Sequence, residues 1–162
     1  MTVMSTMAAY GAVLTHKNDN NAVQSQIQTG SGNNAGGIVE SKGNVSNNDI
    51  YLMARVIEGE AANESFEGKV AVGAVIMNRV ESGKFPGNVP QVIYQPNAFE
   101  AVSNGQYMRP LSQDSIKAAE LAAKGDDPTN GCLYYWNPVT AQSKWVWQRP
   151  IIMQIGRHVF AR

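Results

Sequence analysis

The sequence predicts an α+β fold, in which several helices precede a small antiparallel sheet. Residues 49–125 carry helical periodicity and capping residues, whereas the segments 132–136 and 150–161 are rich in β-branched and aromatic side chains. Helices followed by strands are typical of α+β proteins rather than of the alternating α/β class. We see no internal repeat, and the length suits one domain with a core of its own.

The helices are predicted in order along the chain. The first runs through NNDIYLMARVIEGEAA, with Asn48 as its N-cap and Asp49 in its first turn. The second, SFEGKVAVGAVIMNRVESG, ends near Gly83, and NVPQVIYQ predicts a short helical turn. The third full helix, SQDSIKAAELAAKG, has Ser112 as its cap and Gly125 as its stop.

The last part of the sequence predicts strands. CLYYW and PIIMQIGRHVFA have the composition of short antiparallel strands. Trp145 and Trp147 lie between them, two residues apart, which would place both on one face of a strand. On such a face the two indoles either fill a core or bind a substrate. The pattern leaves both interpretations open.

Composition excludes several classes of function. Thirteen basic residues balance thirteen acidic ones, so the chain has no electrostatic footprint for nucleic acid or an anionic membrane. No apolar run approaches the roughly 20 residues of a membrane span. We expect no metal and no other cofactor, because the predicted domain has one histidine, His158, and no Cys-x-x-Cys or His-x-x-x-His spacing.

Residues 1–48 differ from the rest and predict a flexible or partner-docking tail, before a domain that spans residues 49–162. The tail has few charges and is rich in Asn, Gln, Ser and Gly, so it can bury little apolar surface. No basic residue precedes the apolar residues at the start of the sequence, and we therefore find no clear signal peptide.

One glutamate in VIEGEAANESFEGKV stands out on a helical wheel. Glu60 lies inside the apolar arc of the first helix, three residues after Ile57, four after Val56 and seven after Met53. A carboxylate on the core side is costly unless it is paired, protonated or lines a cleft. Desolvation would raise its pKa and suit it to general acid catalysis. Alternatively, the helix frays at Gly59 and Glu60 is exposed.

The neighbouring glutamates have structural interpretations. Glu58 falls on the polar side of the wheel, where it can pair with Arg55 at the surface. Glu64 and Glu67 lie around the break between the first two helices, and acidic residues favour a helix N-terminus.

Aromatic rings and amides gather in two segments, YQPNAFEAV and YYWNPVTAQSKWVW. Sugars stack on aromatic faces and bond amides through their hydroxyl and acetamido groups, so this mixture suits a sugar-binding groove; a filled core is the alternative. The amides are Gln95, Asn97, Asn137 and Gln142. A Cys132–His158 pair could also serve a cysteine peptidase or amidase. However, Cys132 enters a strand, where no helix N-terminus would lower its pKa.

From about Asp49 to Arg162 the chain resembles the SleB/CwlJ-type cell-wall hydrolases. The resemblance rests on LMARVIEGEAANESFEGKVAVGAVIMNRV, FPGNVPQVIYQPNAFEAV, LYYWNPVTAQSKWVWQRP and IGRHVFA. It implies a lysozyme-like helical part beside a small sheet, and lytic transglycosylation of peptidoglycan by the glutamate of a Gly-Glu-Ala/Ser pattern, here Glu60. The family usually has Arg-Gly before its next glutamate, where this chain has Ala62-Asn63. The sequence contains no recognisable wall-binding domain, and in this respect it resembles a short wall hydrolase or a phage lysin.

The resemblance and the aromatic pattern together suggest a set of site residues. Glu60 is expected to be catalytic, and the substrate-binding residues are expected to be Glu64, Gln95, Phe99, Tyr134, Tyr135, Asn137, Lys144 and Trp147. The partner would be the glycan strand, and the tail could bind a spore coat or phage particle, so the protein would act on the wall outside the cell, in a spore or in a virion. Hydrolysis with Glu64 or Glu67 as a second carboxylate, and a non-catalytic wall-binding or virion module, remain alternatives.

Overall fold

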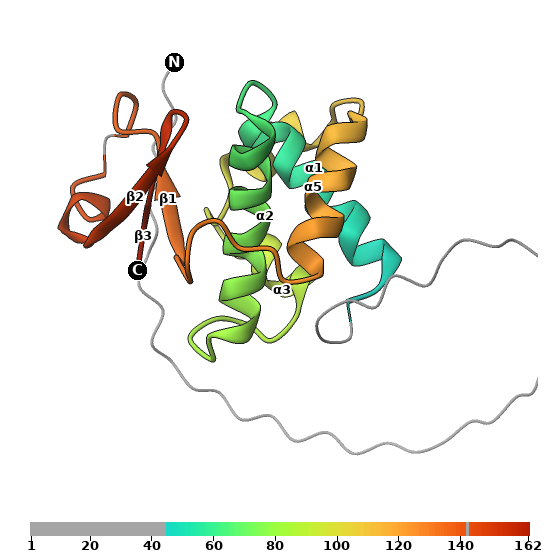
Figure 1. The fold of residues 1–162 in the computed structure, drawn as a ribbon, viewed down its shortest axis with the longest axis horizontal. Coiled ribbons are helices and arrows are strands. Elements are labelled where there is room, and N and C mark those ends of the chain that lie inside the picture. Colours follow the sequence, from blue (N-terminus) through green and yellow to red (C-terminus); the bar gives the residue numbers. More distant parts are fainter. Residues whose placement is uncertain (1–44, 142) are drawn as a thin grey trace, which may run out of the picture.

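The structure is a computed structural model that describes residues 45–141 and 143–162 of the chain. The predicted tail thus lies almost wholly outside the described residues. The described part has a group of helices and, to one side of it, a small antiparallel sheet formed by the end of the chain (Figure 1). The α+β fold predicted from the sequence is confirmed.

The helices follow the predicted order, with one addition. They are α1 (Asn47–Ala61), α2 (Phe66–Glu81), α3 (Val89–Ile93), α4 (Glu100–Asn104) and α5 (Gln113–Ala123), with 3₁₀ turns η1 (Gln106–Met108) and η2 (Val146–Gln148). The short helix α4 was not predicted. Ser112 caps α5 as predicted, accepting a hydrogen bond from the backbone N–H of Ser115.

The start of α1 corrects the predicted boundary. Ser46 is the N-cap: its Oγ accepts from the backbone N–H of Asp49 at 3.2 Å, and the Asp49 carboxylate accepts from the backbone N–H of Ser46 at 3.0 Å. This reciprocal capping box needs an acid three residues after the cap. Asn48 therefore lies inside the helix, and the folded part begins before residue 49.

The sheet has the order β1-β3-β2, from β1 (Tyr134–Trp136), β2 (Ile151–Ile155) and β3 (His158–Ala161), with both pairs antiparallel. The prediction that Trp145 and Trp147 lie on a strand was wrong. The Asn137 side chain accepts from the backbone N–H of Val139 at 2.9 Å, which starts a turn and ends β1. Trp147 instead lies in the 3₁₀ turn η2, and Trp145 directly precedes it, in the connection between β1 and β2.

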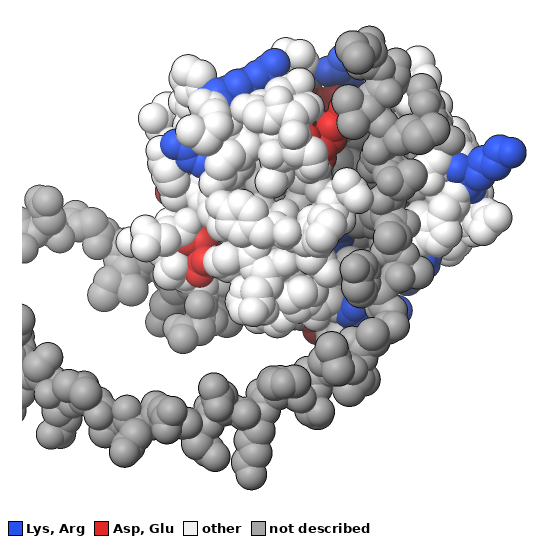
Figure 2. Space-filling view, turned by 180° about the vertical axis from the view of Figure 1, so that it is seen from behind, with Lys and Arg blue, Asp and Glu red and all other residues white. Residues whose placement is uncertain are grey.

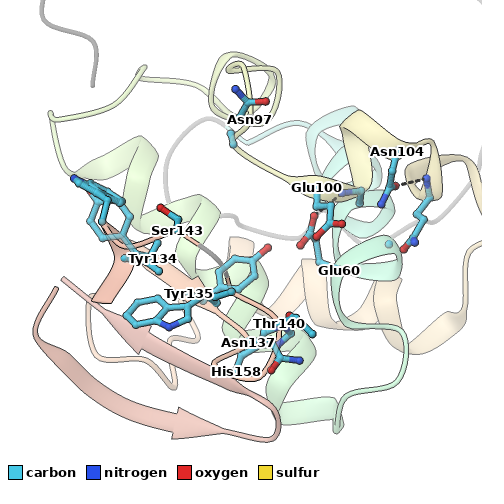
Figure 3. Close-up of a pocket in the computed structure, with 18 of the residues that line it drawn as sticks. Glu60, Asn97, Glu100, Asn104, Tyr134, Tyr135, Asn137, Thr140, Ser143 and His158 are labelled. Carbon is cyan, nitrogen blue, oxygen red and sulfur yellow. Dashed lines mark hydrogen bonds between the residues drawn. The ribbon is translucent and has the colours of Figure 1, made fainter. Parts of the chain in front are cut away.

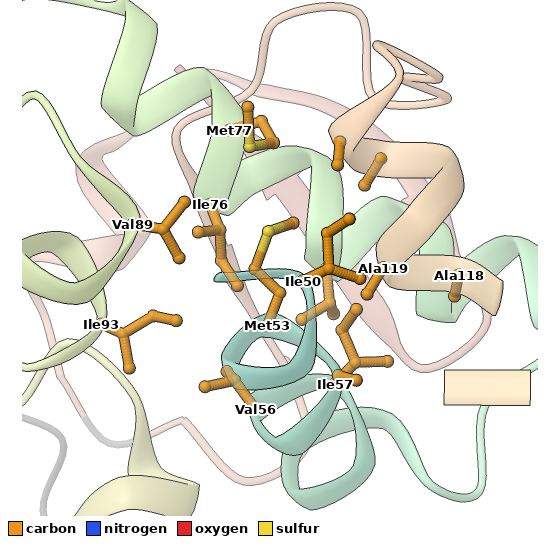
Figure 4. Close-up of a cluster of buried hydrophobic side chains, with 14 of the residues drawn as sticks. Ile50, Met53, Val56, Ile57, Ile76, Met77, Val89, Ile93, Ala118 and Ala119 are labelled. Carbon is orange, nitrogen blue, oxygen red and sulfur yellow. The ribbon is translucent and has the colours of Figure 1, made fainter. Parts of the chain in front are cut away.

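The main core lies where α1 packs against α2, α3 and α5 (Figure 4). Met53, Val56 and Ile57 of α1 are fully buried there against Ile76 of α2 and Ile93 of α3. Burying each such side chain contributes about 1.5–3 kcal/mol. These contacts fix the rotation of α1 about its own axis, and so they also fix the direction in which its last turn points.

Helix α2 lies between the other long helices and the sheet (Figure 1). Its other face carries Ala71 and Val75, which pack with Cys132 and Phe160 in a second buried cluster. The sheet is therefore anchored on α2, and Tyr135, which is paired with Phe160 on the same face of the sheet, reaches Glu60 at the end of α1.

The described surface carries scattered charges. On the face in Figure 2, isolated blue and red side chains lie among uncharged ones, so neither sign of charge dominates it. Across residues 45–141 and 143–162, every helix is too short or too polar to cross a lipid bilayer.

Candidate active site

A groove of about 670 Å³ lies between the helices and the sheet. The helices contribute Glu60, Arg79, Glu100 and Asn104 to its lining, and the turn between α3 and α4 contributes Asn97. The sheet and the loop after β1 contribute Tyr134, Tyr135, Asn137, Thr140 and His158 (Figure 3). In the described ranges, His, Cys, Asp and Glu side chains nowhere gather in a group of three that could hold a metal ion.

Glu60 lies in the last turn of α1 and points into this groove (Figure 3). The helix continues through Ala61, so it does not fray at Gly59. Burial raises the pKa of Glu60, whereas hydrogen bonds from the backbone N–H of Ala101, at 2.7 Å from Oε1, and from Tyr135 act in the opposite direction. The net shift is upward, as the helical wheel predicted.

The residue before Glu60 lets α4 come close to α1. A Cβ atom on Gly59 would lie only 2.4 Å from the Cβ of Ala101, a distance that real side chains do not tolerate. Glycine at this position therefore brings the backbone of α4 within hydrogen-bonding distance of the Glu60 carboxyl group.

Glu100, the first residue of α4, is a groove residue that sequence reasoning missed. It is exposed, and it lies beside Glu60 in Figure 3. Its negative charge raises the pKa of Glu60 further. The acid in NAFEAV gives no sign by itself that it lies in the groove, because its position depends on the packing of α4 on Gly59.

Arg79 of α2 is the buried cation of the groove and was also missed. It is 2% exposed, its Nε donates to the backbone carbonyl of Leu133 at 2.8 Å, and its guanidinium lies over the rings of Phe85, Phe99 and Tyr134. The interpretation of Phe99 as a substrate-binding residue needs correction, because Phe99 is itself 2% exposed and belongs to the main core.

Tyr135 and His158 form the sheet side of the groove. The two rings meet edge to face with centroids 5.3 Å apart. Burial and the nearby charge of Glu60 raise the pKa of Tyr135 well above its usual value, and burial lowers the pKa of His158. Both environments favour the uncharged side chain, so this wall offers hydrogen bonds rather than charge.

Only some of the other predicted binding residues line the groove. Tyr134 and Asn137 line the groove, but Gln95, Lys144 and Trp147 are not part of its lining. Trp147 is 48% exposed and packs edge-on against Trp136. Gln142 lies outside the described residues.

Glu64 faces the sheet rather than the groove. Its side chain is 4% exposed and accepts from Nε of Arg157 at 2.7 Å and from the backbone N–H of Arg157 at 3.1 Å. Burial opposes ionisation of Glu64, but these two bonds outweigh it and lower its pKa. The contact joins the α1–α2 connection to the turn between β2 and β3. We therefore assign Glu64 to this junction, not to substrate binding.

Glu58 does not pair with Arg55, contrary to the sequence interpretation. Its carboxylate accepts from the backbone N–H and the hydroxyl of Ser112 and from the hydroxyl of Ser115. Burial opposes its ionisation, but the serine bonds outweigh it and lower the pKa. Arg55 instead donates to the hydroxyl of Tyr51 and the carbonyl of Tyr107. Glu58 thus holds the start of α5 against α1.

Cys132 lies in the buried cluster between α2 and the sheet and is not part of the groove lining. Burial raises the pKa of its thiol. A nucleophilic cysteine needs the opposite shift and access to substrate, so the geometry does not favour a Cys132–His158 pair.

Comparison with known proteins shows which family this chain resembles. The profile of a family described as Cell Wall Hydrolase matches residues 63–161, a range that begins just after Glu60. The chain is 42% identical over 156 residues to a spore cortex-lytic enzyme of Bacillus cereus, and 34% identical over 120 residues to the cell wall hydrolase CwlJ of Bacillus subtilis. The first match covers 90% of this chain and the second 69%.

Solved structures agree with these matches. The crystal structure of the catalytic domain of the Bacillus cereus SleB protein aligns with a TM-score of 0.70 and 47% identity, covering 79% of this chain and 100% of that chain. The catalytic domain of the germination-specific lytic transglycosylase SleB from Bacillus anthracis aligns with the same TM-score and identity, covering 75% of this chain and 99% of that one. The chain spans 60% of the length of the Bacillus cereus relative and 83% of CwlJ.

Proposed function

The chain belongs to the cell wall hydrolase family, and from this premise we propose that it is an enzyme that cleaves the glycan strand of peptidoglycan. The bond cleaved is the glycosidic bond between N-acetylmuramic acid and N-acetylglucosamine. One observation carries the proposal: Glu60 is a carboxyl group in a groove where burial favours its protonated form. This is what a general acid for glycoside cleavage requires.

In the proposed mechanism, Glu60 serves as acid and then as base. It gives its proton to the glycosidic oxygen, the C1–O bond breaks, and an oxocarbenium-like muramic acid develops. The ionised Glu60 then takes the proton of that sugar's C6 hydroxyl as O6 bonds to C1, which closes a 1,6-anhydro ring. Lytic transglycosylation of this kind consumes no water.

The positions of the other two predicted acids support this route over two-carboxylate hydrolysis. Glu64 is bound to Arg157, and Glu67 is exposed at the start of α2, outside the groove lining. An inverting or retaining hydrolase needs its second carboxylate across the sugar from the first. Neither glutamate occupies such a position, and Glu100 lies beside Glu60 rather than across the groove from it (Figure 3).

Unpartnered polar atoms in the groove lining support glycan binding. Among the described residues, Arg79 Nη1, Trp136 Nε1 and His158 Nδ1 are buried and have no hydrogen-bond partner, and all three side chains line the groove. A buried polar atom without a partner costs about 1–3 kcal/mol. Hydroxyl and acetamido groups of a glycan can accept hydrogen bonds from Arg79 and Trp136, and can accept from or donate to the uncharged ring of His158. With them, Tyr134, Tyr135 and Asn137 are the predicted binding residues that we retain.

We extend the proposal to location and to the tail. The curated relatives are spore cortex-lytic enzymes and cell wall hydrolases, so the wall or spore cortex is the proposed place of action, with assembly into a phage particle as the other route. Residues 1–48 would tether the domain to a protein partner there. A chain lacking residues 1–44 should then fold and cleave purified walls; an unfolded truncated chain would contradict this role.

The deciding experiment compares Glu60→Gln with Glu58→Gln in the full chain, on purified sacculi. Glu60→Gln keeps the side-chain volume and removes the proton donor, so turnover should fall at least roughly 100-fold. Glu58→Gln should keep its turnover and lose some thermal stability, because Glu58 holds α5. Equal losses of turnover would contradict the role of Glu60. Thiol-blocked wild-type protein should remain active, and a loss of turnover in protein that is still folded would revive the cysteine alternative.

A further inference from the structure

Two carboxyl groups share the groove, one from each of two helices that touch. Glu60 comes from α1 and Glu100 from α4, and they lie beside each other in Figure 3. The residue after Glu100 donates its backbone N–H to the Glu60 carboxyl at 2.7 Å. This bond and the close packing of Ala101 on Gly59 fix the backbone of Glu100 next to Glu60.

The groups that face Glu60 come from every element around it. Helix α4 contributes the charge of Glu100, α2 the cation of Arg79, β1 the hydroxyl of Tyr135, and β3 the uncharged ring of His158. Arg79 favours ionised Glu60, but its charge acts on Glu60 less strongly than that of Glu100, and its Nε donates to the Leu133 carbonyl rather than to Glu60. Glu100 is the facing group whose charge opposes that of Arg79.

Building on the proposed role of Glu60, we propose that Glu100 is a positioning residue for glycan cleavage: its negative charge keeps the proton on Glu60 until the glycosidic oxygen takes it. Two like charges at close range resist joint ionisation. Glu60 is recessed in the groove whereas Glu100 is exposed, so burial disfavours the charged form of Glu60.

A purely structural role for Glu100 makes a different prediction. Glu100 lies in the first turn of α4, where an acid stabilises the helix N-terminus. Loss of that effect would change thermal stability without moving the pH dependence of the reaction. Asp114 lies in the equivalent first turn of α5, is exposed, and is not a groove residue, so it provides a matched control.

The test is the rate of glycan release from purified sacculi between about pH 4 and 9, for the full-length wild type, Glu100→Gln and Asp114→Asn. Removing the charge of Glu100 lets Glu60 ionise at lower pH, so the alkaline limb of the profile should move to lower pH. The loss should reach about two- to tenfold near neutral pH and vanish on the acid side. Asp114→Asn should follow the wild-type profile.

Added salt provides a second readout, since it screens an exposed charge. The wild-type alkaline limb should move toward that of Glu100→Gln, whose own limb should move less. Superimposable profiles for wild type and Glu100→Gln would overturn the inference while an inactive Glu60→Gln left the proposed function intact. An active Glu60→Gln would instead remove the proposed function. If Glu100→Gln were inactive at every pH, Glu100 would be a catalytic residue, which also overturns the inference.

Discussion

Glu60 and Glu64 lie four residues apart, but their surroundings shift the pKa of the carboxyl group in opposite directions. Around Glu60, burial and the charge of Glu100 outweigh the hydrogen bonds and raise its pKa. Around Glu64, the backbone and side-chain bonds from Arg157 outweigh burial and lower its pKa. Burial alone therefore does not identify a catalytic acid; what matters is whether burial and like charge outweigh the donors and cations beside the carboxyl group.

The end of α1 separates the two regions. The helix stops at Ala61, so Glu64 does not follow Glu60 one turn later on the same face. Instead it meets the turn between β2 and β3, where Gly156 leaves room for it: a Cβ on Gly156 would collide with Glu64 Oε2. Of these two carboxyl groups, Glu60 thus stays in the groove and Glu64 holds the sheet to the helices.

Among substitutions that leave both carboxyl groups in place, the largest effect is expected from Gly59→Ala, which should disrupt the Glu60 region alone. The added methyl group collides with Ala101 and pushes α4 away from α1, breaking the 2.7 Å bond to Glu60. We expect a loss of about 1–3 kcal/mol in unfolding free energy and at least roughly tenfold in turnover. Urea unfolding and glycan release would measure both. Wild-type turnover would show that the close approach of α4 does not matter.

Glu64→Ala should disrupt the junction in the same way but with a smaller effect. It removes a carboxylate that accepts two bonds, although Arg157 is 60% exposed and can turn to water. A loss of about 1–2 kcal/mol is expected after allowing for that screening. Arg157→Ala is the matched partner, and a double-mutant cycle should show coupling between them. Additive losses would mean that the contact contributes nothing.

Stability against pH should distinguish the two carboxyl groups by sign. Glu60 has a raised pKa, so its favourable contribution is complete below the unfolded-state pKa and is lost as pH rises through the folded-state pKa. Glu60→Gln should therefore gain stability over wild type toward neutral pH. Glu64 has a lowered pKa, so its contribution is present above the unfolded-state pKa and is lost as pH falls through the folded-state pKa. Glu64→Gln should be less stable than wild type at neutral pH, with the gap closing in acid.

Parallel urea titrations at several pH values would measure both trends. Curves of the same sign for the two variants would show that the regions do not differ as described.

Tyr135→Phe is the mildest change, and it tests the two neighbours that shift the pKa of Glu60 in opposite directions, Tyr135 and Glu100. The hydroxyl of Tyr135 favours ionised Glu60, so its loss should move the alkaline limb of activity to higher pH. That direction is opposite to the shift expected for Glu100→Gln. Rates on sacculi across the alkaline range would test it, and a shift to lower pH would mean that Tyr135 does not act on Glu60 in this way.

The sequence predicted those features that depend on local pattern. The three long helices, the Ser112 cap, the two strand segments and the recessed Glu60 all follow from periodicity or capping within one segment. A local pattern could not predict the role of Glu58, because its serine partners are more than fifty residues away in sequence.

Features that depend on contacts between distant segments were not predicted. Arg79 and Glu100 reach the groove only because α2 and α4 pack beside the end of α1. The Glu64–Arg157 contact likewise forms only because the β2–β3 turn lies next to the α1–α2 connection. Phe99 was misplaced because an aromatic side chain in a polar segment looks the same whether it fills a core or lines a groove.

The central claim is that one recessed carboxyl group, Glu60, cleaves the glycan without activating water. Mass spectrometry of the muropeptides released from purified sacculi tests it most directly, with Glu60→Gln as the blank. The account predicts fragments that end in 1,6-anhydro-N-acetylmuramic acid and carry no new reducing end, with none released by Glu60→Gln. Fragments with reducing N-acetylmuramic acid ends would show that water attacks the sugar, and would contradict the single-carboxyl mechanism.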